Sequence, residues 1–183
     1  MKVIEEISAI FATRGAAAYF GEHVSMLEHA LQAAHFARAA AAPQPLILAA
    51  LLHDVGHLVE EVPDDLEDWT SDAQHEQVGS SWLAARFPAE VFEPVRLHVP
   101  AKRYLCATDP HYVSKLSAAS VVTLKLQGGP MTTAEIALFE SERYHKDAVR
   151  IRRWDDQGKV RGLPTADLAS YGPMIEELLL AAH

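Results

Sequence analysis

Apolar residues along this chain recur mainly every third or fourth position, and strand-like alternation is hard to find. Residues 2–13 carry one apolar face and predict a first helix. Residues 23–42 are apolar nearly all round, which is typical of a buried central helix. Pro43 and Pro45 end that segment and open a third helix, since proline is tolerated in a first turn. Its apolar run, 45–52, leads directly into a histidine and an aspartate.

The remaining segments continue the helical pattern. The later helices are predicted over residues 71–86, 88–98, 109–116, 117–126, 132–143, 146–156 and 175–182. Pro100 is expected to interrupt the helix predicted over 88–98. Residues 61–71 and 158–173 are predicted to be loops. Because no repeat, low-complexity tract or linker separates these segments, we expect one all-α domain over residues 1–183.

Composition narrows the class of protein. The net charge is -9, with 25 acidic and 16 basic residues, which argues against a nucleic-acid partner because no excess positive field exists. Cys106 is the only cysteine, so no disulfide can form within the chain and a reducing compartment fits. Neither a signal peptide nor a run of about 20 apolar residues is seen. We therefore expect a cytoplasmic protein without a membrane partner.

The stretch 51–57, Leu-Leu-His-Asp-Val-Gly-His, contains the first candidate chemistry. A carboxylate at the end of a buried apolar run is costly unless a positive group compensates it, and a metal ion is one such group. Asp54 has two oxygens and could bridge two ions, while His53 offers a nitrogen ligand. His57 lies four residues after His53 and is expected on the same helical face. The alternative is a solvated capping pair at a helix end.

Other polar residues also lie in apolar helical company. The set of candidate metal ligands is His29, His53, Asp54, His75, His98 and Asp155. Each alone could be a hydrogen-bonded core residue, but together they form a nitrogen- and oxygen-rich donor set without a thiolate. Such donors suit iron or manganese and speak against a cysteine-based structural zinc site.

Basic residues accompany two of these candidates. Lys102 follows His98 by four residues and Arg152 precedes Asp155 by three, spacings that bring side chains together on a helix. Cations beside a dimetal centre fit a phosphoryl or phosphonyl substrate. We interpret three other basic residues as surface charge: Arg153, Lys159 and Arg161.

Five segments together resemble a known family. They are residues 19–22 (Tyr-Phe-Gly-Glu), 27–32, 51–57, 96–105 and 152–156 (Arg-Arg-Trp-Asp-Asp). The chain is similar to the HD-domain superfamily, whose members are mostly metal-dependent phosphohydrolases. It most resembles the branch of mixed-valent di-iron oxygenases that includes myo-inositol oxygenase and phosphonate-cleaving enzymes. The resemblance implies an HD-domain helical bundle with a dimetal site at its centre.

The resemblance also implies a role for each candidate. One iron ion would be bound by His29, His53 and Asp155, and the other by His75 and His98, with Asp54 bridging the two. The centre would hold Fe(II) and Fe(III) and use O2 as co-substrate. The residues around the phosphonate oxygens would be Lys102, Ser120, Arg152 and His57. Catalysis would involve His57 and a lid of Tyr19 and Glu22, with Tyr19 at the open iron position and Glu22 pairing with the substrate nitrogen.

The activity implied is O2-dependent cleavage of the carbon–phosphorus bond in a 1-hydroxy-2-aminoethylphosphonate-type substrate. The free amine would give glycine and phosphate, and the trimethylammonio analogue would give glycine betaine. Glu22 slightly favours the free amine, because a primary ammonium can donate to a carboxylate and a trimethylammonium cannot. Two alternatives are an HD-type phosphohydrolase of nucleotides or other phosphomonoesters and a non-catalytic regulatory module. Loss of ligands would indicate the latter, and none is missing.

Overall fold

The computed structural model describes residues 2–16, 19, 22–59 and 74–180, and within them it contains α-helices and no β-strand. The helices are α1 (Val3–Arg14), α2 (Met26–Ala39), α3 (Gln44–Leu51), α4 (Gly56–Val59), α5 (His75–Ala84), α6 (Ala89–Arg96), α7 (His98–Thr108), α8 (Ala118–Leu126), α9 (Thr133–Ser141), α10 (His145–Gln157) and α11 (Gly172–Leu178). Two short 3₁₀ helices are η2 (Val113–Lys115) and η3 (Leu168–Tyr171). The predicted all-α fold is confirmed.

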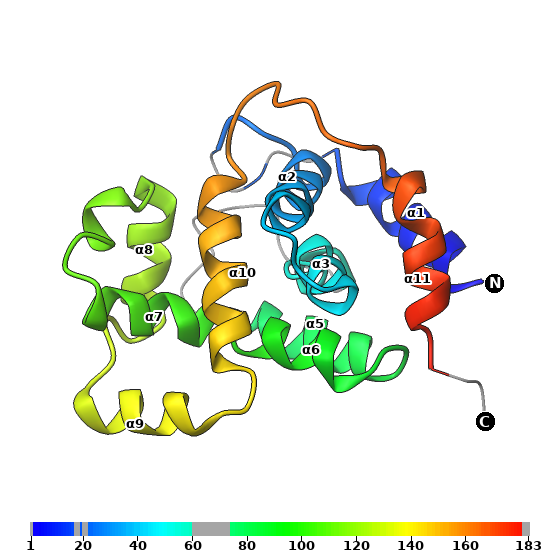
Figure 1. The fold of residues 1–183 in the computed structure, drawn as a ribbon. Helices are drawn as coiled ribbons and strands as arrows, with labels where there is room; N and C mark the ends of the chain where they lie inside the picture. Colours follow the sequence, from blue (N-terminus) through cyan, green and yellow to red (C-terminus); the bar gives the residue numbers. More distant parts are fainter. Residues whose placement is uncertain (1, 17–18, 20–21, 60–73, 181–183) are drawn as a thin grey trace.

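Helix α3 lies at the centre of the bundle. It packs against α2, α6 and α10, and Figure 1 shows α1 and α11 on one side of this core and α7, α8 and α9 on the other. Its residues Leu48, Leu51 and Leu52, the last just past its end, are almost fully buried. Burying one such side chain contributes about 1.5–3 kcal/mol, so the apolar run predicted from the sequence anchors the fold. The chain leaves this core at His53.

Capping residues decide where several helices begin. Ser25 Oγ accepts a hydrogen bond from the Glu28 N–H, and the Glu28 carboxylate accepts one from the Ser25 N–H. This capping box starts α2 at Met26, so the helix is shorter than the predicted 23–42. Thr132 and Glu135 form the same box at the start of α9.

Two predictions around residue 100 were wrong. Pro100 does not interrupt a helix. It lies in the first turn of α7, where its missing N–H costs nothing. His98 and Lys102 are therefore on the same helix. The helix predicted over 109–116 is only the 3₁₀ turn η2. Asp109 Oδ1 accepts a hydrogen bond from the His111 N–H at 3.1 Å, and this local turn replaces helical backbone bonds.

The break after α3 was also missed. Helix α3 ends at Leu51, His53 and Asp54 lie in the following turn, and α4 starts at Gly56, so His57 is not on a continuous helical face with His53. Gly56, the first residue of α4, lies against the backbone of α5. A Cβ at this residue would lie 1.9 Å from the His75 carbonyl oxygen and 2.9 Å from the Gly79 nitrogen. Glycine therefore lets α4 and α5 approach closely, which brings His75 towards Asp54.

The predicted loop at 61–71 and the predicted helix start at 71–73 lie outside the described residues. Helix α5 is described from His75, preceded by Gln74 in the left-handed region with φ 49°. The predicted loop 158–173 contains η3, and α11 begins at Gly172 rather than at Ile175. No helix in the described part of the chain is long and apolar enough to cross a bilayer.

Candidate metal centre and substrate pocket

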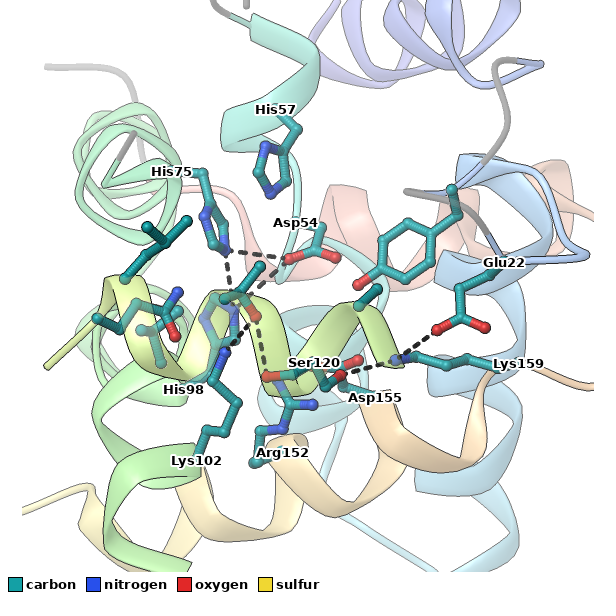
Figure 2. A pocket seen from close by; sticks show the side chains of 16 residues that line it. Glu22, Asp54, His57, His75, His98, Lys102, Ser120, Arg152, Asp155 and Lys159 are labelled. Atoms are coloured by element: carbon teal, nitrogen blue, oxygen red, sulfur yellow. Dashed lines mark hydrogen bonds and ion pairs between the residues drawn. The ribbon is translucent and has the colours of Figure 1, made fainter. Parts of the chain in front are cut away.

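The six candidate ligands come from five parts of the chain and meet in one place. They are contributed by α2 (His29), the turn after α3 (His53 and Asp54), the start of α5 (His75), the start of α7 (His98) and α10 (Asp155). All are buried except His75, whose side chain is 12% exposed. Figure 2 shows His75 and His98 on one side of Asp54. The bundle therefore gathers the donor set that the sequence predicted.

Asp54 lies between two groups of histidines. Its Oδ2 is 3.2 Å from His53 Nε2 and 3.5 Å from His29 Nε2. Its Oδ1 is 3.4 Å from His75 Nε2 and 3.5 Å from His98 Nε2. These atoms form two sets, each able to surround an ion, and Asp54 belongs to both. A carboxylate with one oxygen facing each set has the arrangement of a bridging ligand.

The histidine tautomers test whether metal ions fit. The Nδ1 atoms of three rings lie 2.7–2.9 Å from backbone carbonyl oxygens that can only accept hydrogen bonds: His29 with Gly158, His53 with Ala50 and His98 with Val95. Each Nδ1 must therefore carry a hydrogen, which leaves Nε2 as the ligand atom of the neutral ring. The carbonyls thus fix the tautomer that metal binding requires.

The Nε2 atoms themselves face one another. Those of His29 and His53 are 3.1 Å apart, and those of His75 and His98 are 3.3 Å apart. Two lone pairs repel at this distance unless a proton or a metal ion lies between them. Ligands about 2.1 Å from one ion and at a near-right angle would lie about 3.0 Å apart, close to both observed separations. The residues therefore fit two metal ions.

Asp155 lies beside the first set. Its Oδ1 is 3.4 Å from His29 Nε2 and has no hydrogen-bond partner among the described residues, although it is buried. Its Oδ2 is 2.6 Å from Arg152 Nη1. Burial opposes ionisation, but the Arg152 guanidinium outweighs it and holds the pKa of Asp155 well below its usual range. Asp155 is therefore an anion with one buried oxygen directed at the histidines.

Charges within the cluster stabilise one another. Burial lowers the pKa of His53, but the Asp54 carboxylate overcomes this effect and raises it to about 9. Burial would raise the pKa of Asp54, but His53 and the neighbouring rings hold it well below its usual range. A buried anion that is kept charged among imidazoles can accept a metal in place of the proton.

A pocket opens beside the cluster and brings together the predicted substrate-binding residues. Its lining includes Tyr19, Glu22, His57, Lys102, Ser120 and Arg152. Lys102 is 2% exposed and its Nζ donates to Thr123 Oγ1 at 2.8 Å. His57 stacks on His75 with ring centroids 3.9 Å apart, and burial followed by the nearby His75 holds the pKa of His57 well below its usual range. The sequence-predicted set therefore faces one cavity.

Arg152 contacts Asp156 and Tyr112 as well as Asp155, the contact predicted from its spacing. Its Nη1 pairs with Asp155, its Nη2 with Asp156, and its Nε donates to the Tyr112 hydroxyl at 3.0 Å. The Asp155 carboxylate first and the Asp156 carboxylate next outweigh burial and raise the pKa of Arg152. The guanidinium therefore orients a candidate metal ligand while also lining the pocket.

Tyr19 covers the first set of ligands. Its ring stacks on His29 with centroids 3.8 Å apart and planes 16° apart. Burial, and next the Asp155 and Asp54 carboxylates, raise the pKa of its hydroxyl well above the usual range. The Glu22 N–H donates to the Tyr19 carbonyl at 2.7 Å, so a backbone hydrogen bond joins the two predicted lid residues. Phe20, which lies between them, is outside the described residues.

Lys159 was assigned to the surface, and this interpretation was wrong. Its side chain is 13% exposed, lines the pocket and lies 3.4 Å from Glu22 Oε1 (Figure 2). A spacing signal was available, because Lys159 follows Asp155 by four residues, as Lys102 follows His98. Among the other basic residues assigned to the surface, Arg153 pairs with Asp109 on the exterior.

Comparison with known proteins places the chain in a family. The HD domain model matches residues 26–147. The chain is 49% identical to hydroxymethylphosphonate dioxygenase of Gimesia maris, over 88% of this chain and 81% of that one. It is 42% identical to the glycine-betaine-forming 1-hydroxy-2-(trimethylamino)ethylphosphonate dioxygenase of Leisingera caerulea, over 97% and 90%. An uncharacterized protein of Acanthamoeba polyphaga mimivirus is 32% identical, over 97% and 84%. The chain belongs to the HD-domain family and, within it, to the oxygenase branch that contains these phosphonate dioxygenases.

Proposed function

We propose that this protein uses O2 to cleave the carbon–phosphorus bond of a 1-hydroxyphosphonate. The reaction converts R–CH(OH)–PO3H2 and O2 into R–COOH and H3PO4, in which both oxygen atoms of O2 are retained. The carbon is oxidised from the alcohol to the carboxylic acid as O2 is reduced. The proposal is carried by the position of Asp54 between two sets of histidines. It is supported by the similarity of this chain to two phosphonate dioxygenases.

We infer that the metals are two iron ions. The first would be bound by His29, His53 and Asp155, the second by His75 and His98, and Asp54 would bridge them. Nitrogen and oxygen donors without a thiolate suit iron, and an Fe(II)/Fe(III) pair would supply a Lewis acid for the substrate and electrons for O2. Our proposal gives this chain's residues the tasks of fixing the ions, holding the substrate and excluding water.

The phosphonate would lie among the polar groups that share the pocket. Lys102 presents a buried ammonium, and Ser120 a hydroxyl that lies 3.2 Å from Ser117 Oγ. His57 and Arg152 approach from opposite walls as potential donors. Charge-assisted hydrogen bonds from such groups to phosphonate oxygens are worth about 1.5–3 kcal/mol each. These contacts would orient the hydroxyl-bearing carbon towards the metal centre.

Tyr19 and Glu22 would act as a lid. Tyr19 stacks on His29 and is 8% exposed, so it shields the first set of ligands from water. The Tyr19 hydroxyl would give way when the substrate binds beside the first set of ligands. Exclusion of water strengthens each electrostatic contact inside the pocket.

The main competing function is metal-dependent hydrolysis of a phosphomonoester, since the HD fold also supports that reaction. The protein should be purified anaerobically, loaded with iron and mixed with a panel of 1-hydroxyphosphonates and phosphomonoesters. We expect phosphate from the phosphonates only when O2 is supplied, and none from the phosphomonoesters. Oxygen-independent phosphate release from a phosphomonoester would favour the hydrolase.

A further inference from the structure

Lys159 is held in place by its neighbours in the chain. The carbonyl of Gly158 accepts a hydrogen bond from His29 Nδ1 at 2.9 Å. Val160 donates to Gln32 Oε1 at 2.9 Å and accepts from Gln32 Nε2 at 2.8 Å. His29 and Gln32 are both buried on α2. Lys159 therefore sits between two backbone contacts to the core, which fix where its side chain begins.

The side chain of Lys159 then enters the pocket. Its Nζ lies 3.2 Å from Ser120 Oγ, 3.4 Å from Ser117 Oγ and 3.4 Å from Glu22 Oε1. The contact with Glu22 is an ion pair without hydrogen-bond geometry. Figure 2 shows the ammonium between Glu22 and Ser120. The cation thus joins the lid to the wall that carries a proposed phosphonate contact.

Glu22 is the carboxylate available to a cationic substrate. The carboxylates that line the pocket in the described part of the chain are Glu22, Asp54 and Asp155, and the last two belong to the metal cluster. The charge of Glu22 is already balanced by Lys159. An ammonium group on the substrate would have to displace Lys159 or lie beside it, and two like charges in a poorly solvated site repel strongly.

We propose that Lys159 is a specificity-determining residue that makes the pocket select a 1-hydroxyphosphonate without a cationic substituent. This inference rests on the proposed function and replaces the sequence-based expectation that Glu22 pairs with a substrate amine. The simplest such substrate is hydroxymethylphosphonate. Its reaction, HOCH2–PO3H2 + O2 → HCOOH + H3PO4, balances without another reactant. The Lys159 ammonium would create this selectivity by repelling substrates that carry a cationic substituent.

The test compares three substrates: hydroxymethylphosphonate, 1-hydroxy-2-aminoethylphosphonate and its trimethylated analogue. For each, kcat/KM for phosphate release is measured with iron-loaded protein, and Kd is measured by anaerobic calorimetry. The variants are Lys159→Met, which removes the charge, and Lys159→Arg, which keeps it. Lys146→Met is the matched control, because Lys146 is exposed and outside the pocket. Iron content and melting temperature establish that each variant is folded and loaded.

We expect the unmodified protein to prefer hydroxymethylphosphonate by at least about tenfold, given the cost of like charges. Lys159→Met should shift this ratio towards the two cationic compounds by at least about tenfold, in both kcat/KM and Kd. Lys159→Arg and Lys146→Met should leave the ratio near that of the unmodified protein. If Lys159 had only a structural role, Lys159→Met would change kcat/KM and Kd for all three substrates by similar factors.

Two results would overturn the proposal. One is a preference of the unmodified protein for either cationic compound, which decides the matter even if every Lys159 variant fails to fold. The other is an unchanged ratio in a folded, iron-loaded Lys159→Met protein. If no compound releases phosphate with O2, the proposed function is wrong, and the anaerobic Kd ratios still decide for or against selection by Lys159.

Discussion

Removal of the Asp54 carboxylate is expected to disrupt both metal sites at once. Asp54 belongs to both sets of ligand atoms, whereas His98 belongs to one. Each ion at 100 times its dissociation constant stabilises the folded state by about 2.7 kcal/mol, so two ions give about 5 kcal/mol. At about 2–4 °C per kcal/mol for a chain of this size, metal should raise the melting temperature by roughly 10–20 °C.

In Asp54→Ala we expect this metal-induced rise to disappear, together with bound iron. His98→Ala is the matched control and should keep about half of the rise and the ion of the first set. Thermal denaturation with and without Fe(II) under argon measures the shift, and elemental analysis measures the metal. An Asp54→Ala protein that still binds two ions, or gains as much stability from iron as the unmodified protein, would refute the bridging assignment.

The metal-free protein offers a second test of the same residue through pH. The pKa of His53 is raised from 6.5 to about 9, which corresponds to about 3 kcal/mol of stability at 1.36 kcal/mol per unit. A raised pKa means that this stability is complete below pH about 6.5 and is lost as pH rises through 9. Asp54→Ala should lack it. The stability difference between the two metal-free proteins should therefore shrink between pH 6 and pH 10, as followed by urea denaturation; a constant difference would contradict the pairing.

Four further substitutions test the surroundings of the centre. Lys102→Met should raise KM or Kd for a phosphonate by roughly 10–100-fold, because one charge-assisted hydrogen bond is lost, while the iron content stays unchanged. Unchanged kinetics would show that Lys102 does not bind the phosphonate. Arg152→Lys cannot keep the forked contacts and should lower iron affinity by roughly 10–100-fold, as seen for partners of metal ligands, which anaerobic titration would detect. Gly56→Ala places its Cβ 1.9 Å from a backbone oxygen and should destabilise the fold by about 1–3 kcal/mol or more with loss of the second ion. Gly79→Ala, with nearest atoms at 3.0–3.4 Å, should cost less in the same denaturation assay.

The candidate ligands could be predicted from the sequence because each is a polar residue among apolar neighbours in the chain. Asp54 follows an apolar run and stands beside His53, a combination that needs compensation wherever it is buried. The spacing of Arg152 and Asp155 likewise predicted a contact that the structure contains. Local pattern identified these residues as candidates, and the family resemblance supplied their assignment to two ions.

Other features depend on contacts between distant residues. The spacing of Lys159 from Asp155 is a weak signal, and its position is fixed by Gly158, whose carbonyl oxygen accepts a hydrogen bond from His29, 129 positions away in the chain. No local pattern contains that contact. The close contact at Gly56 is similar, because a Cβ there would clash with the backbone of His75 and Gly79 on another helix. Tertiary packing therefore decided the pocket's charge and the position of His57.

The most direct test is a paired measurement of phosphate release and O2 consumption by the anaerobically purified, iron-loaded protein with hydroxymethylphosphonate. We expect phosphate and formate to appear with one O2 consumed per phosphate, as the atom balance requires, and neither to appear under argon. Phosphate released under argon, or O2 consumed without phosphate, would contradict an oxidative cleavage of the carbon–phosphorus bond.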